Sequence, residues 1–271
     1  MELDEILKVE NQELSSGTVE IWTLNRPEKL NALNSKVLGR LDTEGTRLES
    51  ILKEDLAARR ALILRGAGEK SFVAGADISE MKSFTAEEAR DFSRLGHRAF
   101  GRLEKLPIPT LVMLQGFTLG GGLELAMCCD ILISSPTAEF GQPESNLGII
   151  PGFGGTVRLA SRIGMGKALE LLFSGQRIKA LEAQNLGLIN RIVSDTDLFQ
   201  ATLKVADELT MRSSPLAIAM IKRLARAAET RHFELACQAE AEAFGEIFKS
   251  EDKREGVSAF LEKRKGSFRG K

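Results

Sequence analysis

The feature that most constrains this fold is a repeated order of short apolar segment, glycine turn and helical run. Segments with strand character occur at Val19–Leu24, Ala61–Leu64, Thr110–Gln115 and Asp130–Ser134. Glycines close the second and third of them, and residues with helical spacing lie between them. This recurrence predicts an α/β fold of stacked strand–strand–helix units around a common core.

The C-terminal part of the chain has a different character. Strand signals stop near Asp197, and Ala, Glu, Leu, Lys and Arg dominate from there on. We expect helices at about 197–211, 215–228, 231–249 and 252–264, with Pro215 at the first position of the second helix. The sequence therefore predicts a core of residues 1–196 and a helical region of residues 197–271.

The glycine turn at Gly120–Gly122 leads into a helical run with Glu124 on its first turn. The first N–H groups of a helix have no partner within the helix, so they can face a developing negative charge. Taken alone, the same residues also fit a plain tight turn in which Glu124 favours the positive end of the helix dipole.

A second glycine turn and a second carboxylate strengthen the catalytic interpretation. The N–H groups of Ala74–Asp77 and of Gly120–Gly122 would form an oxyanion hole if they converged. Glu144 follows Gly141–Pro143, and two carboxylates with different protonation preferences can share the proton transfers of water addition. The alternative for Glu144 is a solvated loop carboxylate. The glycines at 152–155 and 164–166 match neither the dinucleotide-binding nor the P-loop pattern.

Composition excludes several other classes of function. The chain has only two histidines, His97 and His232, and three cysteines, two of them adjacent, which leaves little material for histidine catalysis, zinc or disulfides. The net charge of −1 argues against nucleic acid, and the basic segment at 263–271 is either solvated or near a small phosphorylated ligand. An acidic N-terminus and the lack of a long apolar run predict a cytoplasmic protein without a membrane span.

Taken in order, six motifs resemble the enoyl-CoA hydratase/isomerase (crotonase) family over about residues 19–265. They are Asn25–Leu33, Ala74–Ile78, Gly116–Ala126, Phe140–Glu144, Leu147–Thr156 and Ala259–Lys265. The resemblance implies the ClpP/crotonase superfold with a C-terminal helical trimerisation region, assembled as a homotrimer or a dimer of trimers. It also implies an acyl-CoA thioester as substrate, with no metal and no cofactor beyond the coenzyme A of that substrate.

The resemblance also assigns roles to residues. The N–H groups of Ala76 and Gly121 would hold the thioester carbonyl, Glu124 would activate water, Glu144 would protonate the α-carbon, and the Gly152 backbone would help place the water. The coenzyme A site would be lined by Lys29, Leu30, Ala74 and Ile78, and approached from a neighbouring subunit by Phe260 and Lys263.

These roles predict a hydro-lyase that reversibly adds water to a trans-2-enoyl-CoA to give the 3-hydroxyacyl-CoA, as in fatty-acid β-oxidation. The alternatives are an enoyl-CoA isomerase, a hydratase of a branched or aromatic-pathway intermediate, and a non-catalytic acyl-CoA-binding oligomer. Met81–Arg94 should shape the acyl pocket but has no pattern that we can interpret, so the acyl length is left open.

Overall fold

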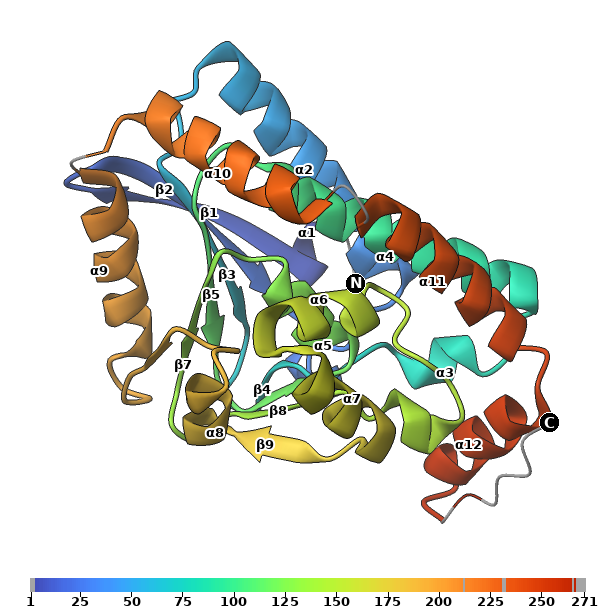
Figure 1. Ribbon diagram of the computed structural model, residues 1–271. Helices are drawn as coiled ribbons and strands as arrows, with labels where there is room; N and C mark the ends of the chain where they lie inside the picture. Colours follow the sequence, from blue (N-terminus) through green and yellow to red (C-terminus); the bar gives the residue numbers. More distant parts are fainter. Residues whose placement is uncertain (1–2, 212, 231–232, 265, 267–271) are drawn as a thin grey trace.

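A computed structural model describes residues 3–211, 213–230, 233–264 and 266, and Figure 1 shows its two sheets and the helices around them. The strands are β1 Leu7–Leu14, β2 Gly17–Leu24, β3 Ala61–Gly66, β4 Ser71–Val73, β5 Thr110–Leu114, β6 Phe117–Leu119, β7 Ile131–Ser134, β8 Glu139–Gly141, β9 Arg177–Lys179 and β10 Arg191–Ile192. The α-helices are α1 Leu3–Ile6, α2 Ser35–Glu54, α3 Ile78–Met81, α4 Ala86–Lys105, α5 Gly121–Met127, α6 Gly155–Ile163, α7 Met165–Ser174, α8 Ala180–Asn185, α9 Leu198–Met211, α10 Pro215–Thr230, α11 Phe233–Ile247 and α12 Glu251–Leu261. Two 3₁₀ turns, η1 Pro27–Lys29 and η2 Glu144–Leu147, complete the assignment.

The repeated units distribute their strands between two sheets. The larger sheet has the order β1-β2-β3-β5-β7-β10, and the smaller has the order β4-β6-β8-β9. Each of the pairs β3–β4, β5–β6 and β7–β8 places its first strand in the larger sheet and its second in the smaller one. Equivalent strands of successive units are parallel neighbours. The prediction of stacked strand–strand–helix units is confirmed.

The central strands are apolar because both faces of the larger sheet are covered. Ile21, Ile63 and Leu111 face one side, where they pack with residues of α9. Leu62 and Leu64 face the other side and pack with α2 and α4. Figure 1 shows α9 on one side of this sheet and α2, α4, α10 and α11 on the other.

The predicted C-terminal helices are all present as α9–α12 and pack against the core. Arg90 and Arg94 of α4 form ion pairs with Glu242 of α11 at 2.9 and 2.8 Å. The division at residue 196 stays a prediction. None of the helices in the described ranges is long and apolar enough to cross a membrane. His232, Lys265 and residues 267–271 lie outside the described residues, and so does most of the basic segment.

Candidate active site

The turn that begins α5 has a backbone that favours glycine. Gly120 has φ +51° and ψ −126°, its N–H donates to the Gly141 carbonyl at 2.9 Å, and its own carbonyl accepts the Glu124 N–H at 3.0 Å. A Cβ on Gly122 would lie 2.7 Å from Val73 Cβ, so only glycine lets α5 approach β4 this closely. The predicted sharp strand-to-helix turn, with Glu124 on the first helical turn, is present.

The two glycine turns lie side by side. Gly75 has φ +120°, and its carbonyl accepts the Leu33 N–H at 2.9 Å. A Cβ on Gly120 would stand 3.7 Å from Gly75 Cα. Among the described residues, no hydrogen-bond acceptor is found for the N–H of Ala76 or of Gly121. Two adjacent turns therefore each offer one backbone donor, as an oxyanion hole requires.

Glu124 is buried and held by backbone groups of a distant loop. Its side chain is 1% exposed, and Oε1 accepts the N–H of Phe153 at 2.8 Å and of Gly155 at 2.6 Å. These two hydrogen bonds fix the position of Oε1. A carboxylate held in place in this way is suited to act as a general base.

Glu144 is also buried, and Gln142 links it to the neighbourhood of Glu124. Glu144 is 8% exposed and Gln142 is 1% exposed. With the amide nitrogen turned toward the carboxylate, Gln142 donates to Glu144 Oε1 at 2.9 Å and to Oε2 at 3.1 Å. A Cβ on Gly155 would lie 2.7 Å from the other end of this amide. It would also lie 2.9 Å from Glu124 Oε1, so Gln142 and Glu124 face the same side of Gly155. The two glutamates thus approach one small region, and a solvated position for Glu144 is wrong.

Gly152 belongs to the same loop as the donors to Glu124. Its carbonyl accepts the Ser93 hydroxyl at 2.5 Å, which fixes the loop to α4. A Cβ on Gly152 would lie 2.8 Å from the Phe244 ring, so a side chain is excluded there. Gly152 directly precedes Phe153, whose N–H donates to Glu124, and its role toward water stays a prediction.

The residues expected at coenzyme A fall into two groups. Leu30 has φ +51°, and its carbonyl accepts the Ala74 N–H at 3.1 Å, so the turn at Lys29 and Leu30 lies against the start of the oxyanion turn. Ile78 begins α3 just after that turn. Phe260, which is 53% exposed, instead lies on α12.

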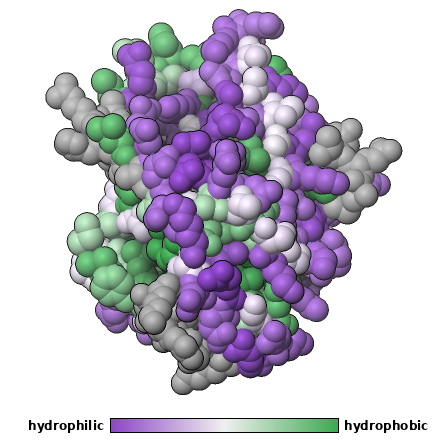
Figure 2. All heavy atoms as spheres, turned by 90° about the vertical axis from the view of Figure 1, so that its right-hand side faces the viewer, coloured by the Kyte–Doolittle hydropathy of each residue, from purple (hydrophilic) through white to green (hydrophobic). Residues whose placement is uncertain are grey.

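Lys263, just beyond the end of α12, is also exposed. The face that carries α12 is mainly hydrophilic, with hydrophobic residues in separate groups (Figure 2). One chain therefore brings Leu30, Ala74 and Ile78 to the oxyanion turn, and it leaves Phe260 and Lys263 exposed at the end of α12.

The fold and the site agree with the comparison to known proteins. The family model described as enoyl-CoA hydratase/isomerase matches residues 14–271. The chain belongs to the enoyl-CoA hydratase/isomerase family. Among the relatives of this family, a short-chain-enoyl-CoA hydratase of Clostridium acetobutylicum is 47% identical over 249 residues, which cover 92% of this chain and 93% of that protein.

Two further members of the enoyl-CoA hydratase/isomerase family show the same breadth of match. A crotonyl-CoA hydratase of Syntrophomonas wolfei is 42% identical over 90% of this chain and 92% of its own length. A crystal structure of an enoyl-CoA hydratase from Bacillus anthracis has a TM-score of 0.75 and 32% identity, covering 98% of this chain and all of that one. The crotonase fold that the motifs imply is confirmed.

Two residues of this enoyl-CoA hydratase/isomerase site, Gln142 and Arg26, were given no role from the sequence. Gln142 stands inside a motif that was used only for Glu144. Arg26 donates to the Ala32 carbonyl at 2.6 Å and to Asp77 at 3.1 Å, and so fixes the turn that carries Ala76. Burial alone would raise the pKa of Asp77, but hydrogen bonds from Ser79 and Arg26 and the positive charge of Arg26 lower it. In the sequence, only the position of Arg26 within the Asn25–Leu33 motif pointed to a role for it.

Proposed function

We propose that this protein is an enoyl-CoA hydratase, a hydro-lyase that reversibly adds water to a trans-2-enoyl-CoA to give the 3-hydroxyacyl-CoA. The observation that carries the proposal is the approach of two buried carboxylates, Glu124 and Glu144, to adjacent turns whose two N–H donors have no acceptor in the part of the chain that the structure describes. The names of the two curated relatives support the same reaction.

The reaction follows from the positions of these groups. The thioester oxygen of the bound substrate accepts the N–H groups of Ala76 and Gly121. Glu124 takes a proton from water as the water oxygen bonds to C3, and the electrons of the double bond move through C2 onto the thioester oxygen. Glu144 then gives a proton to C2, and the carbonyl re-forms. Each backbone donor to such an oxyanion contributes about 10²–10³ in rate, and each proton transfer about 10²–10⁴.

The region beside the oxyanion turn supports a short acyl chain. A Cβ on Gly121 would lie 3.1 Å from the ring of Phe153, which is 2% exposed. Behind that ring the space is filled by further phenylalanines, with Phe92 at 5.2 Å and Phe100 at 5.5 Å between ring centroids. Bulky rings packed this closely leave no room for a long chain in this direction. We propose a four-carbon enoyl group as the best substrate.

An oligomer is the assembly that the surface supports. The outward face of α10 carries exposed apolar residues, with Leu216, Ile221 and Leu224 each more than 60% exposed. Patches of this kind mark association surfaces. We propose a homotrimer or a dimer of trimers in which Phe260 and Lys263 meet a neighbour's coenzyme A. Sedimentation would detect the assembly. The cytoplasmic location, the β-oxidation role and the lack of a separate cofactor stay predictions.

A substrate panel tests the proposal. Conjugated enoyl thioesters absorb in the ultraviolet, and hydration removes this absorbance. We expect loss of absorbance with trans-2-butenoyl-CoA and a fall in kcat/KM of at least about tenfold when the chain is extended to eight carbons. A protein that leaves all conjugated enoyl-CoA unchanged but produces absorbance from a 3-enoyl-CoA would be an isomerase. One that binds the thioesters without turnover would be a non-catalytic binder.

A further inference from the structure

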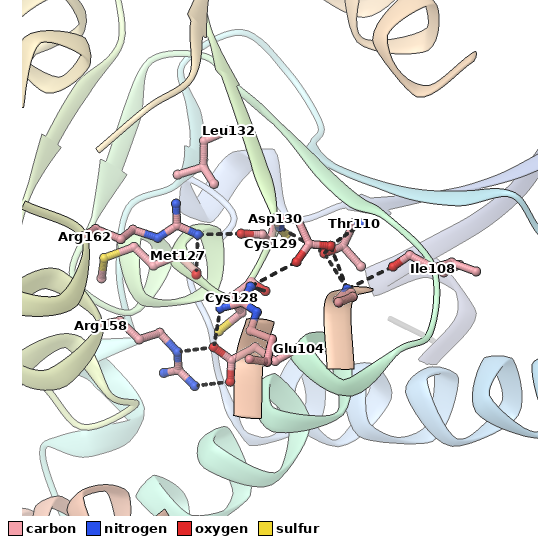
Figure 3. Close-up of polar contacts among 12 residues, drawn as sticks. Glu104, Ile108, Thr110, Met127, Cys128, Cys129, Asp130, Leu132, Arg158 and Arg162 are labelled. Carbon is pink, nitrogen blue, oxygen red and sulfur yellow. Dashed lines mark hydrogen bonds and ion pairs between the residues drawn. The ribbon is translucent and has the colours of Figure 1, made fainter. Parts of the chain in front are cut away.

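A buried cluster of charged groups lies behind the site and touches the loop that holds Glu124. Figure 3 shows Glu104, Asp130, Arg158 and Arg162 grouped around the C-terminal end of α5. Arg158 is 4% exposed, and its side chain lies among residues from α4, α5 and α6. The reaction proposed above uses none of these residues.

Arg158 contacts the backbone of the loop that holds Glu124. Its Nη1 donates to the carbonyl of Phe153 at 2.5 Å. A Cβ on Gly154, which has φ +99°, would collide with the same nitrogen, so the guanidinium lies directly against the Phe153–Gly154 peptide. The N–H groups on the two sides of this peptide, those of Phe153 and Gly155, are the donors to Glu124.

Glu104 fixes the orientation of the guanidinium. Arg158 Nε lies 2.8 Å from Glu104 Oε1, and Nη2 lies 2.9 Å from Oε2. A two-point pair of this kind sets the plane of the guanidinium as well as its position. Burial alone would raise the pKa of Glu104, but the charge and hydrogen bonds of Arg158 lower it. The pair therefore stays ionised.

We propose that Arg158, oriented by Glu104, is a positioning residue that keeps the Phe153–Gly155 backbone in place to hold Glu124 for catalysis. The inference rests on the proposed hydratase function. The proposed role belongs to Arg158 and Glu104 and does not extend to Arg162, which contacts a different part of the backbone. Arg162, one turn further along α6, donates to the carbonyls of Met127 at 2.8 Å and Cys129 at 2.5 Å, at the C-terminal end of α5 and not to the loop that donates to the Glu124 side chain.

Arg162 therefore supplies a matched control. In Arg158→Lys the charge remains, but a single ammonium nitrogen cannot reproduce the three contacts that Nε, Nη1 and Nη2 make from separate positions. A misplacement of about 1 Å near the reacting centre costs on the order of 10²-fold in rate, so we expect kcat for trans-2-butenoyl-CoA to fall by at least about tenfold while KM changes less than about threefold. Arg162→Lys removes similar contacts from the same helix, and it should keep kcat within about threefold of the parent.

A second comparison asks whether Arg158 acts through Glu124. In the Glu124→Gln background, Arg158→Lys should cause little further loss of kcat, because the group that it positions no longer acts as a base. A full further loss in that background would overturn the inference. So would an Arg158→Lys variant with the kcat of the parent, or equal losses in Arg158→Lys and Arg162→Lys.

If Arg158→Lys does not fold, Glu104→Gln serves in its place, since it keeps the shape of the side chain and releases the guanidinium from its two-point pair. Its kcat should fall with KM nearly unchanged, and an unchanged kcat would overturn the inference. A parent protein that hydrates no enoyl-CoA would refute the proposed function instead.

Discussion

Gly122→Ala is the substitution whose effect follows most directly from the geometry. The added methyl would lie 2.7 Å from Val73 Cβ and against the Val73 carbonyl, where carbon atoms normally stay about 3.5–4.0 Å apart. Helix α5 and strand β4 must therefore separate by about 1 Å. Ala76 follows β4 and Gly121 begins α5, so the separation falls between the two proposed oxyanion donors.

The expected losses can be estimated from that displacement. Misplacement by about 1 Å near the reacting centre costs on the order of 10²-fold in kcat. Forcing a methyl into a packed core costs about 1–3 kcal/mol of unfolding free energy. The absorbance assay with trans-2-butenoyl-CoA gives kcat, and the fluorescence of Trp22, the single tryptophan, gives the unfolding free energy.

Gly101→Ala is the matched control. It lies within α4 with no heavy atom within 4 Å of an added Cβ, so it should keep kcat and gain about 0.5–1 kcal/mol in stability. If Gly122→Ala does not fold, Gly121→Ala makes a smaller displacement, since its methyl would stand 3.1 Å from the Phe153 ring. A folded Gly122→Ala protein with kcat within about threefold of the parent would refute the oxyanion geometry.

Further predictions concern the rest of the molecule. Glu20→Gln removes the buried carboxylate that pairs with Arg59 and that Arg47 shares with Glu44, so the unfolding free energy should fall by about 3 kcal/mol while kcat stays unchanged; denaturant titration measures the fall. Burial raises the pKa of the Cys129 thiol to about 12, so iodoacetamide at pH 8 should alkylate it only after unfolding, as peptide mass spectrometry would show. Burial alone would raise the pKa of Asp130, but the charge and hydrogen bond of Lys222 lower it below 3.8. The ionised carboxylate therefore stabilises the fold above pH 3.8, and this stabilisation is lost as the pH falls further. Asp130→Asn should therefore be less stable than the parent at pH 7, and thermal unfolding should show the difference shrinking below about pH 4.

The strands that could be predicted are those with a continuous apolar run, such as β3 and β5, because burial on both faces leaves a strong signal. Strand β1 could not be predicted, since its sequence LKVENQEL is largely exposed and it pairs only with β2 at the sheet edge. Strands β4, β6 and β8 have three residues each, which is too short for any periodicity.

The residues of the site were likewise predictable only in part. Glycine turns and carboxylates are visible as local motifs, but their partners are distant in sequence. The donors to Glu124 stand 29 and 31 residues away, and Arg158 is 54 residues from Glu104. Only the packing of α6 against α4 and α5 brings these groups together, so no local pattern could have indicated them.

The central claim is that Glu124 and Glu144 act on one bound substrate in a single addition of water. It is tested most directly by kcat for trans-2-butenoyl-CoA hydration in Glu124→Gln, Glu144→Gln and the double variant. We expect each single change to lower kcat by at least about 10²-fold, and the double variant to be about as slow as the slower single one, because groups that act as a unit are not additive. A single variant that keeps more than about a tenth of the parental kcat, or a double variant whose loss is the product of the two, would contradict the account.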